Sequence, residues 1–88
     1  MKKIIFNDNK NAISEVLRLH RLQNHLTQQQ LAVKMQVLGA NMDQQMISKI
    51  ESNDRIVTDY ELACFCHILK IEPNEILEKF CKDNGLCE

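Results

Sequence analysis

The sequence has 88 residues, a formal net charge of −1 at pH 7, 44% hydrophobic residues and four cysteines. This length excludes a multidomain enzyme, and the composition excludes an intrinsically disordered chain. We therefore expect residues 1–88 to form one domain, with a possible arm over 1–7 and a tail over 83–88. Since no apolar run is long enough for a spanning helix or a signal peptide, we expect a cytoplasmic protein that does not contact a membrane.

The first half of the sequence predicts two helices. The first begins between residues 8 and 12 and ends near Asn24, since its inward-facing positions have helical spacing: Ile13, Val16, Leu17 and His20. Thr27 and Gln30 form a capping box, in which the Thr side chain and the Gln side chain satisfy each other's backbone N–H groups. This box predicts the start of a second helix, which ends at Gly39.

Three further helices are predicted, so the expected fold class is all-α with five helices. Asp43 caps the third, over about 43–52, and Thr58 caps the fourth. Pro73 suits the first turn of the fifth, which ends near Lys82. One apolar core is expected from Ile13, Leu17, Leu26, Leu31, Ala32, Ile47, Ile50, Leu62, Phe65, Leu69, Ile71, Ile76 and Leu77.

The cysteines and histidines do not have the spacing of a metal site. Cys64 and Cys66 are two positions apart in a predicted helix, so they point to nearly opposite faces. There is also no paired nucleophile and base, and no glycine-rich phosphate loop. We therefore expect no metal, no cofactor and no enzymatic activity.

Charge is distributed unevenly along the chain. Residues 1–55 carry eight Lys and Arg against five Asp and Glu, whereas residues 56–88 carry three against seven. A basic half and an acidic half are typical of a protein with one side facing a polyanion, although an excess this small also arises by chance.

An ordered set of short motifs lies between the first and fourth predicted helices. Arg21 is followed by Leu31-Ala32 and then by Ile47-Ser48-Lys49-Ile50-Glu51. Over residues 12–78 this set resembles the XRE-type helix-turn-helix family of phage-repressor and Cro-like regulators. The resemblance implies a repressor-like helix-turn-helix formed by the second and third helices. It also implies a structural ion pair between Arg21 and Glu51.

The sequence departs from that family at two places. About five extra residues, around 37–42, lie between the second and third helices, which leaves the angle between them open. Asn53 occupies a position where the family usually has Gly, and Asn tolerates the left-handed conformation better than most residues.

The third predicted helix carries side chains that can read bases in a major groove. Gln44 and Gln45 lie in its first turn, where their amides could pair with adenine, and Lys49 lies one turn later. If the long connection rotates the helix, the reading role moves towards Ser48 and Lys49. Without the surrounding motifs, the two glutamines would be a solvated helix start.

Three residues are candidates for contacts with DNA phosphates. Gln28 begins the second helix, where the backbone N–H groups and the helix dipole favour an anion. Arg55 follows the third helix, and Lys34 lies within the second. For these two cations, a solvated surface charge is an equally good interpretation.

The sequence therefore predicts a sequence-specific regulator that binds double-stranded DNA, as a homodimer on a two-fold operator. The dimer surface is expected on the fifth helix and the tail, including Phe80 and Leu86, because the acidic half should face away from DNA. One alternative is an antitoxin-type autorepressor with a toxin or other protein partner. Another is a protein-interaction module of the same fold that does not bind DNA.

Overall fold

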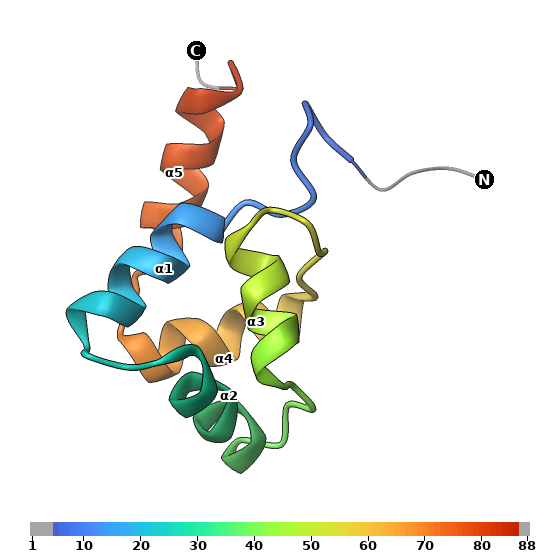
Figure 1. Ribbon diagram of the computed structural model, residues 1–88. Helices are drawn as coiled ribbons and strands as arrows, with labels where there is room; N and C mark the ends of the chain where they lie inside the picture. The colour runs from blue at the N-terminus through green and yellow to red at the C-terminus, as the bar shows by residue number, and fades with distance from the viewer. Residues whose placement is uncertain (1–4, 87–88) are drawn as a thin grey trace.

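The computed structural model describes residues 5–86, and within them the chain is all-α, as predicted (Figure 1). The described residues contain no strand, only an isolated bridge between Phe6 and Asn9. The five helices are α1 (Ser14–Gln23), α2 (Gln28–Val37), α3 (Gln44–Glu51), α4 (Asp59–Leu69) and α5 (Pro73–Asp83).

The predicted caps fix the starts of α2, α3 and α4. The hydroxyl of Thr27 accepts from the N–H of Gln30 at 3.0 Å, and the Gln30 side chain accepts from the N–H of Thr27 at 2.9 Å. Asp43 accepts from the N–H of Met46 at 2.8 Å. Thr58 completes a second capping box. Each contact satisfies a backbone N–H that has no acceptor within the helix, so the capping residue determines where the helix begins.

The first helix begins later than the predicted 8–12, at Ser14. The side-chain oxygen of Asn11 accepts from the N–H groups of Ile13 at 3.0 Å and of Ser14 at 2.9 Å. Residues 6–9 form a tight turn instead of helix, with reciprocal 2.8 Å backbone hydrogen bonds between its ends. Asparagine side chains and this turn satisfy backbone groups that a longer helix would otherwise pair.

Non-glycine residues in the left-handed conformation follow three of the helices. His25 (φ 57°) follows α1, Asn53 (φ 60°) follows α3 and Lys70 (φ 56°) follows α4. The predictions of a left-handed residue within Asn24-His25 and at Asn53 are confirmed. Lys70 was not foreseen, because lysine carries no marked preference for this conformation.

The helices enclose one core, and most of the predicted members are in it. Leu26 and Leu62 are partly buried at its edge. The buried apolar residues are Ile13, Val16, Leu17, Leu31, Ala32, Met35, Ala40, Met42, Ile47, Ile50, Phe65, Cys66, Leu69, Ile71 and Ile76.

The long connection between α2 and α3 contributes to this core. Ala40 and Met42 are both buried, and the side chain of Gln36 donates to the carbonyl of Met42 at 2.8 Å. Gly39, with φ 94°, reverses the chain directly after α2. The extra residues therefore form a compact connection that is packed against the domain.

The prediction of Leu77 as a core residue is wrong, because this side chain is 52% exposed. Helix α5 extends beyond the other four helices, as Figure 1 shows, and Ile76 is its only buried residue. Its other contacts include the ring of Phe6, whose centroid lies 5.8 Å from that of Phe80, and a 3.2 Å pair between His20 and Glu75. Most of α5 therefore lies at the surface.

Candidate nucleic-acid interface

Helix α3 has one buried face and one polar face. Ile47 and Ile50 are fully buried, whereas the opposite side carries residues at positions i, i+1, i+4 and i+5. Three of these four are exposed and Ser48 is half-buried. The polar face consists of Gln44, Gln45, Ser48 and Lys49. All four residues predicted from the sequence to contact bases therefore lie on one surface, which presents two amides, a hydroxyl and an ammonium.

A chain of side-chain hydrogen bonds fixes the first turn of α3 against the first turn of α2. The Nε2 of Gln44 donates to the Oε1 of Gln28 at 2.7 Å. The Nε2 of Gln28 in turn donates to the Oε1 of Glu51 at 3.1 Å. Gln44 thus has a defined orientation in the free protein, and its own Oε1 and second N–H remain free for a ligand.

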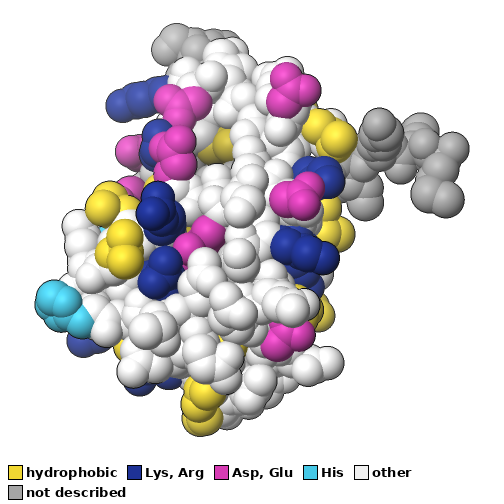
Figure 2. Space-filling view, in the orientation of Figure 1, with side chains coloured by type: hydrophobic (Ala, Val, Ile, Leu, Met, Phe, Trp, Pro, Cys, Tyr) yellow, Lys and Arg dark blue, Asp and Glu magenta, His cyan; other side chains and the backbone are white. Residues whose placement is uncertain are grey.

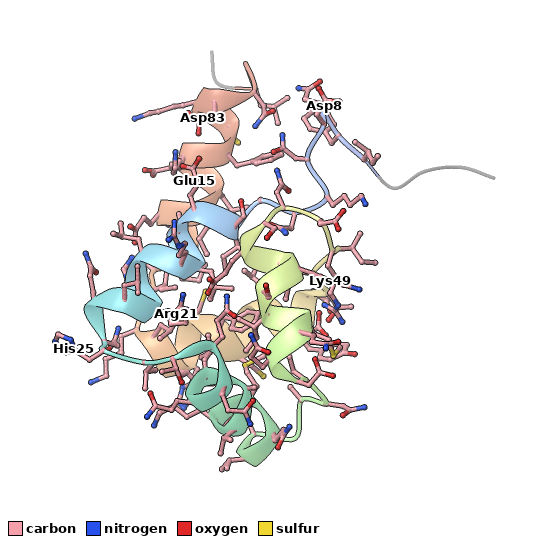
Figure 3. All side chains as sticks on the ribbon, in the orientation of Figure 1. Asp8, Glu15, Arg21, His25, Lys49 and Asp83 are labelled. Atoms are coloured by element: carbon pink, nitrogen blue, oxygen red, sulfur yellow. The ribbon has the colours of Figure 1, made fainter. Side chains whose placement is uncertain are left out.

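Glu51 is also the partner of Arg21, which comes from α1. The Nε and Nη2 atoms of Arg21 lie 2.7 and 3.0 Å from the two carboxylate oxygens, and the side chains are only 10% and 5% exposed. The Nη1 atom donates to the carbonyl of Leu26 at 2.8 Å. The hydrogen bond to Glu51 raises the pKa of Arg21, although burial alone would lower it. Figure 3 labels Arg21 in the region where α1 approaches α2 and α3.

The side chain and the backbone N–H of Gln28 have different roles. Both ends of its side-chain amide are hydrogen-bonded within the protein, to Gln44 and to Glu51. Its backbone N–H, at the first position of α2, has no acceptor within the helix. An anion at this helix start would therefore meet the backbone of Gln28, while its side chain orients Gln44.

The structure gives Arg55 an internal partner that the sequence did not reveal. Its Nη1 and Nη2 atoms lie 3.1 and 3.2 Å from the two carboxylate oxygens of Glu61, which is buried at the start of α4. Burial alone would raise the pKa of Glu61, but hydrogen bonds from Arg55 and from the backbone of Thr58 lower it overall. The Arg55 guanidinium is therefore held by Glu61, and its Nη1 also donates to the carbonyl of Ile56 at 3.0 Å. Only its Nε–H and one N–H of Nη2 remain for the predicted phosphate contact.

This carboxylate makes the stability of the fold depend on pH. Because its folded-state pKa lies below the ordinary value of 4.5, Glu61 stabilises the fold above that pH. This contribution is lost as the pH falls through the folded-state pKa. We expect Glu61→Gln to lower the free energy of unfolding at pH 7 and to make its loss on acidification below about pH 5 shallower. Urea denaturation at several pH values measures both effects.

Glu15→Gln is the control, because the Glu15 side chain is 81% exposed. It should leave the acid limb of the stability curve unchanged. An acid limb identical in the wild type and in Glu61→Gln would contradict the assignment.

Lys34 is not brought to the polar face of α3. It lies on the side of α2 that faces α4, where it lines a shallow groove with Val37 and with His67 and Ile68. The groove contains no residue of α3. The structure therefore separates Lys34 from Gln28 and Gln44, so its predicted phosphate contact gains no support from position.

Comparison with known proteins gives one match. Residues 17–76 match a protein-family model described as helix-turn-helix, a range that covers all of α2 and α3. No curated protein and no solved structure matches the chain. Within residues 5–86, no helix is long and apolar enough to cross a membrane. In the same residues, no group of three or more His, Cys, Asp and Glu could hold a metal ion.

Proposed function

We propose that this chain, which belongs to the XRE-type helix-turn-helix family, is a sequence-specific transcription regulator that reads DNA with α3. The family is one of DNA-binding regulators, so the open questions are which residues read the bases and in what assembly. The observation that supports the proposal is the polar face of α3, whose first glutamine is held by Gln28.

In the proposed complex α3 lies in the major groove. The free Oε1 and second N–H of Gln44 match the donor and acceptor of adenine, so the contact to Gln28 can persist while a base is read. Gln45 and Lys49 lie on the same face, one turn of helix apart. The backbone N–H of Gln28 is directed to a phosphate, which sets the register of the helix along the duplex.

Selection of bound duplexes from a random pool tests this function directly. Enrichment of one sequence supports specific readout. A salt titration on random duplex measures the phosphate contacts, because each one steepens the dependence of affinity on salt. Binding that neither enriches a sequence nor depends on salt would contradict DNA recognition.

We further propose that the protein binds as a dimer through α5 and the residues that follow it. Leu77, in α5, and Leu86, three residues after its end, are 52% and 55% exposed, and Ile76 is the only buried residue of this helix. Two recognition helices related by a two-fold axis would read half-sites about 10 bp apart, one helical turn.

The dimer is tested with Leu77→Lys. A charged side chain in an apolar interface should shift the protein from dimer to monomer in sedimentation and abolish tight binding to a two-fold site. Lys82→Gln, an exposed change on the same helix, is the control and should leave the dimer intact. A selected site without inverted symmetry, or a Leu77→Lys variant that stays dimeric, would contradict the proposal.

One observation favours a second role in binding a protein partner. The groove between α2 and α4 exposes Val33, Val37 and Leu38 together. An apolar surface of this kind is typical of protein contacts. This role fits the antitoxin-type autorepressor, which binds DNA and a toxin, and also an interaction module without DNA binding. The salt titration separates the two, because only the autorepressor makes phosphate contacts.

A further inference from the structure

Asparagine side chains hold the segment that precedes α1, residues 6–12, against the loop after α3. The Oδ1 of Asn53 accepts from the backbone N–H groups of Lys10 at 3.0 Å and of Asn11 at 3.2 Å. The Nδ2 of Asn53 donates to the Oδ1 of Asn9 at 2.7 Å. One side chain at the end of the recognition helix therefore makes three hydrogen bonds to residues more than 40 positions away in the sequence.

Further side-chain hydrogen bonds attach the same segment. The side-chain nitrogen of Asn11 donates to the carbonyls of Ile50 and Arg55, both at 3.0 Å. At the other end, the Nδ2 of Asn9 donates to the Oδ1 of Asn84 at 3.2 Å. Residues 9–11 thus have a defined place beside α3. Of the arm predicted over residues 1–7, residues 1–4 lie outside the described part of the chain.

This attachment places the ammonium of Lys10 at the end of α3. Its Nζ lies 2.8 Å from the Oδ1 of Asp54, and both side chains are substantially exposed, at 38% and 62%. The backbone N–H of Asp54 donates to the carbonyl of Lys49. The hydrogen bond and the charge of Lys10, together with the charge of Lys49, lower the pKa of Asp54. In Figure 2, basic and acidic side chains alternate along the edge of the molecule beside α3, and Figure 3 labels Lys49 there.

We propose that Lys10 contacts a DNA phosphate and that Asn53 is the positioning residue that holds it at the C-terminal end of α3. This inference rests on the proposed function of α3. An exposed ion pair adds little to stability, so a phosphate can replace Asp54 as the partner of Lys10 at small cost. Lys10 lies beside Asp54 at the end of α3, where the sequence predicts a phosphate contact by Arg55. Since Arg55 is paired with buried Glu61, Lys10 is the cation at this edge with an exchangeable partner.

Three variants test the contact of Lys10 itself: Lys10→Gln, Asp54→Asn and the double variant. Affinity for random duplex is measured against salt concentration for each. Lys10→Gln should make the slope of log affinity against log salt shallower by about one unit, the loss of one phosphate contact. The double variant should likewise be about one unit shallower than Asp54→Asn. If Lys10 served only to neutralise Asp54, those two proteins would have the same slope, and this result would overturn the proposal.

Asn53→Gly tests the positioning role. Glycine adopts the φ of 60° without strain, so this change keeps the turn and removes only the three side-chain hydrogen bonds. It should reproduce the shallower slope of Lys10→Gln, and adding Lys10→Gln to it should change the slope no further. If Asn53 had a purely structural role, Asn53→Gly would change the affinity for DNA, but Lys10→Gln would still make the salt slope shallower in that variant.

Two controls make these outcomes separable. Lys70→Gly introduces glycine at a residue with the same backbone conformation, at the end of α4. Its free energy of unfolding shows how much the glycine alone changes stability, because no asparagine contacts are lost there. The unaltered protein is titrated in parallel. If it fails to bind any duplex, the proposed function itself is overturned. If it binds and Lys10→Gln leaves the slope unchanged, only the present inference is overturned.

Discussion

Glu51→Ala is expected to lower the free energy of unfolding by roughly 3–5 kcal/mol, as for breaking a buried ion pair. The Arg21 side chain, 10% exposed, would keep its charge and lose both carboxylate contacts. Gln28 would lose its acceptor at the same time. Domains of this size have only a few kcal/mol of stability, so the variant should be largely unfolded or strongly destabilised in urea denaturation.

The pair formed by Lys79 and Glu15 provides the matched control for this prediction. The two side chains are 3.3 Å apart but substantially exposed, so Glu15→Ala should cost no more than about 1 kcal/mol. Glu51→Gln separates the effect of charge from that of shape. The amide can still accept a hydrogen bond from Arg21, but it cannot neutralise the Arg21 charge. A Glu51→Ala protein with unchanged stability would show that the pair is solvated in solution.

Gln44→Ala and Gln45→Ala are expected to narrow the difference in affinity between the selected site and random duplex. A bidentate contact between an amide and adenine is worth about 1–3 kcal/mol of discrimination, which is up to roughly a hundredfold in affinity. Binding to random duplex should change little, because phosphates are alike at every step of the helix. Parallel titrations of both duplexes measure the effect.

Gln23→Ala is the control, since Gln23 is an exposed glutamine at the end of α1, outside the polar face of α3. It should leave the ratio of the two affinities unchanged. If both α3 variants retained full specificity, base reading would have to be assigned to Ser48 and Lys49, which lie on the same face. That outcome would contradict the roles proposed for Gln44 and Gln45.

Much of the local structure could be predicted from the sequence. The capping residues Thr27, Asp43 and Thr58 each satisfy backbone groups within three residues of themselves, so their effect does not depend on the rest of the fold. The same is true of the left-handed turn at Asn53, which depends on a single residue. Helical spacing likewise placed Ile47 and Ile50 on one side of α3 and the four polar candidates on the other.

What only the tertiary structure decided is which partner each surface cation in the loops meets and how far α5 is covered by the other helices. Arg55 and Lys10 are both surface cations by sequence. One is held by buried Glu61, and the other is placed at the end of α3 by Asn53. Leu77 has helical spacing suited to a core, yet α5 extends past the other helices and leaves it exposed. These outcomes depend on how the helices are oriented, because contacts between distant residues form only once the whole core has packed, and no local pattern encodes that geometry.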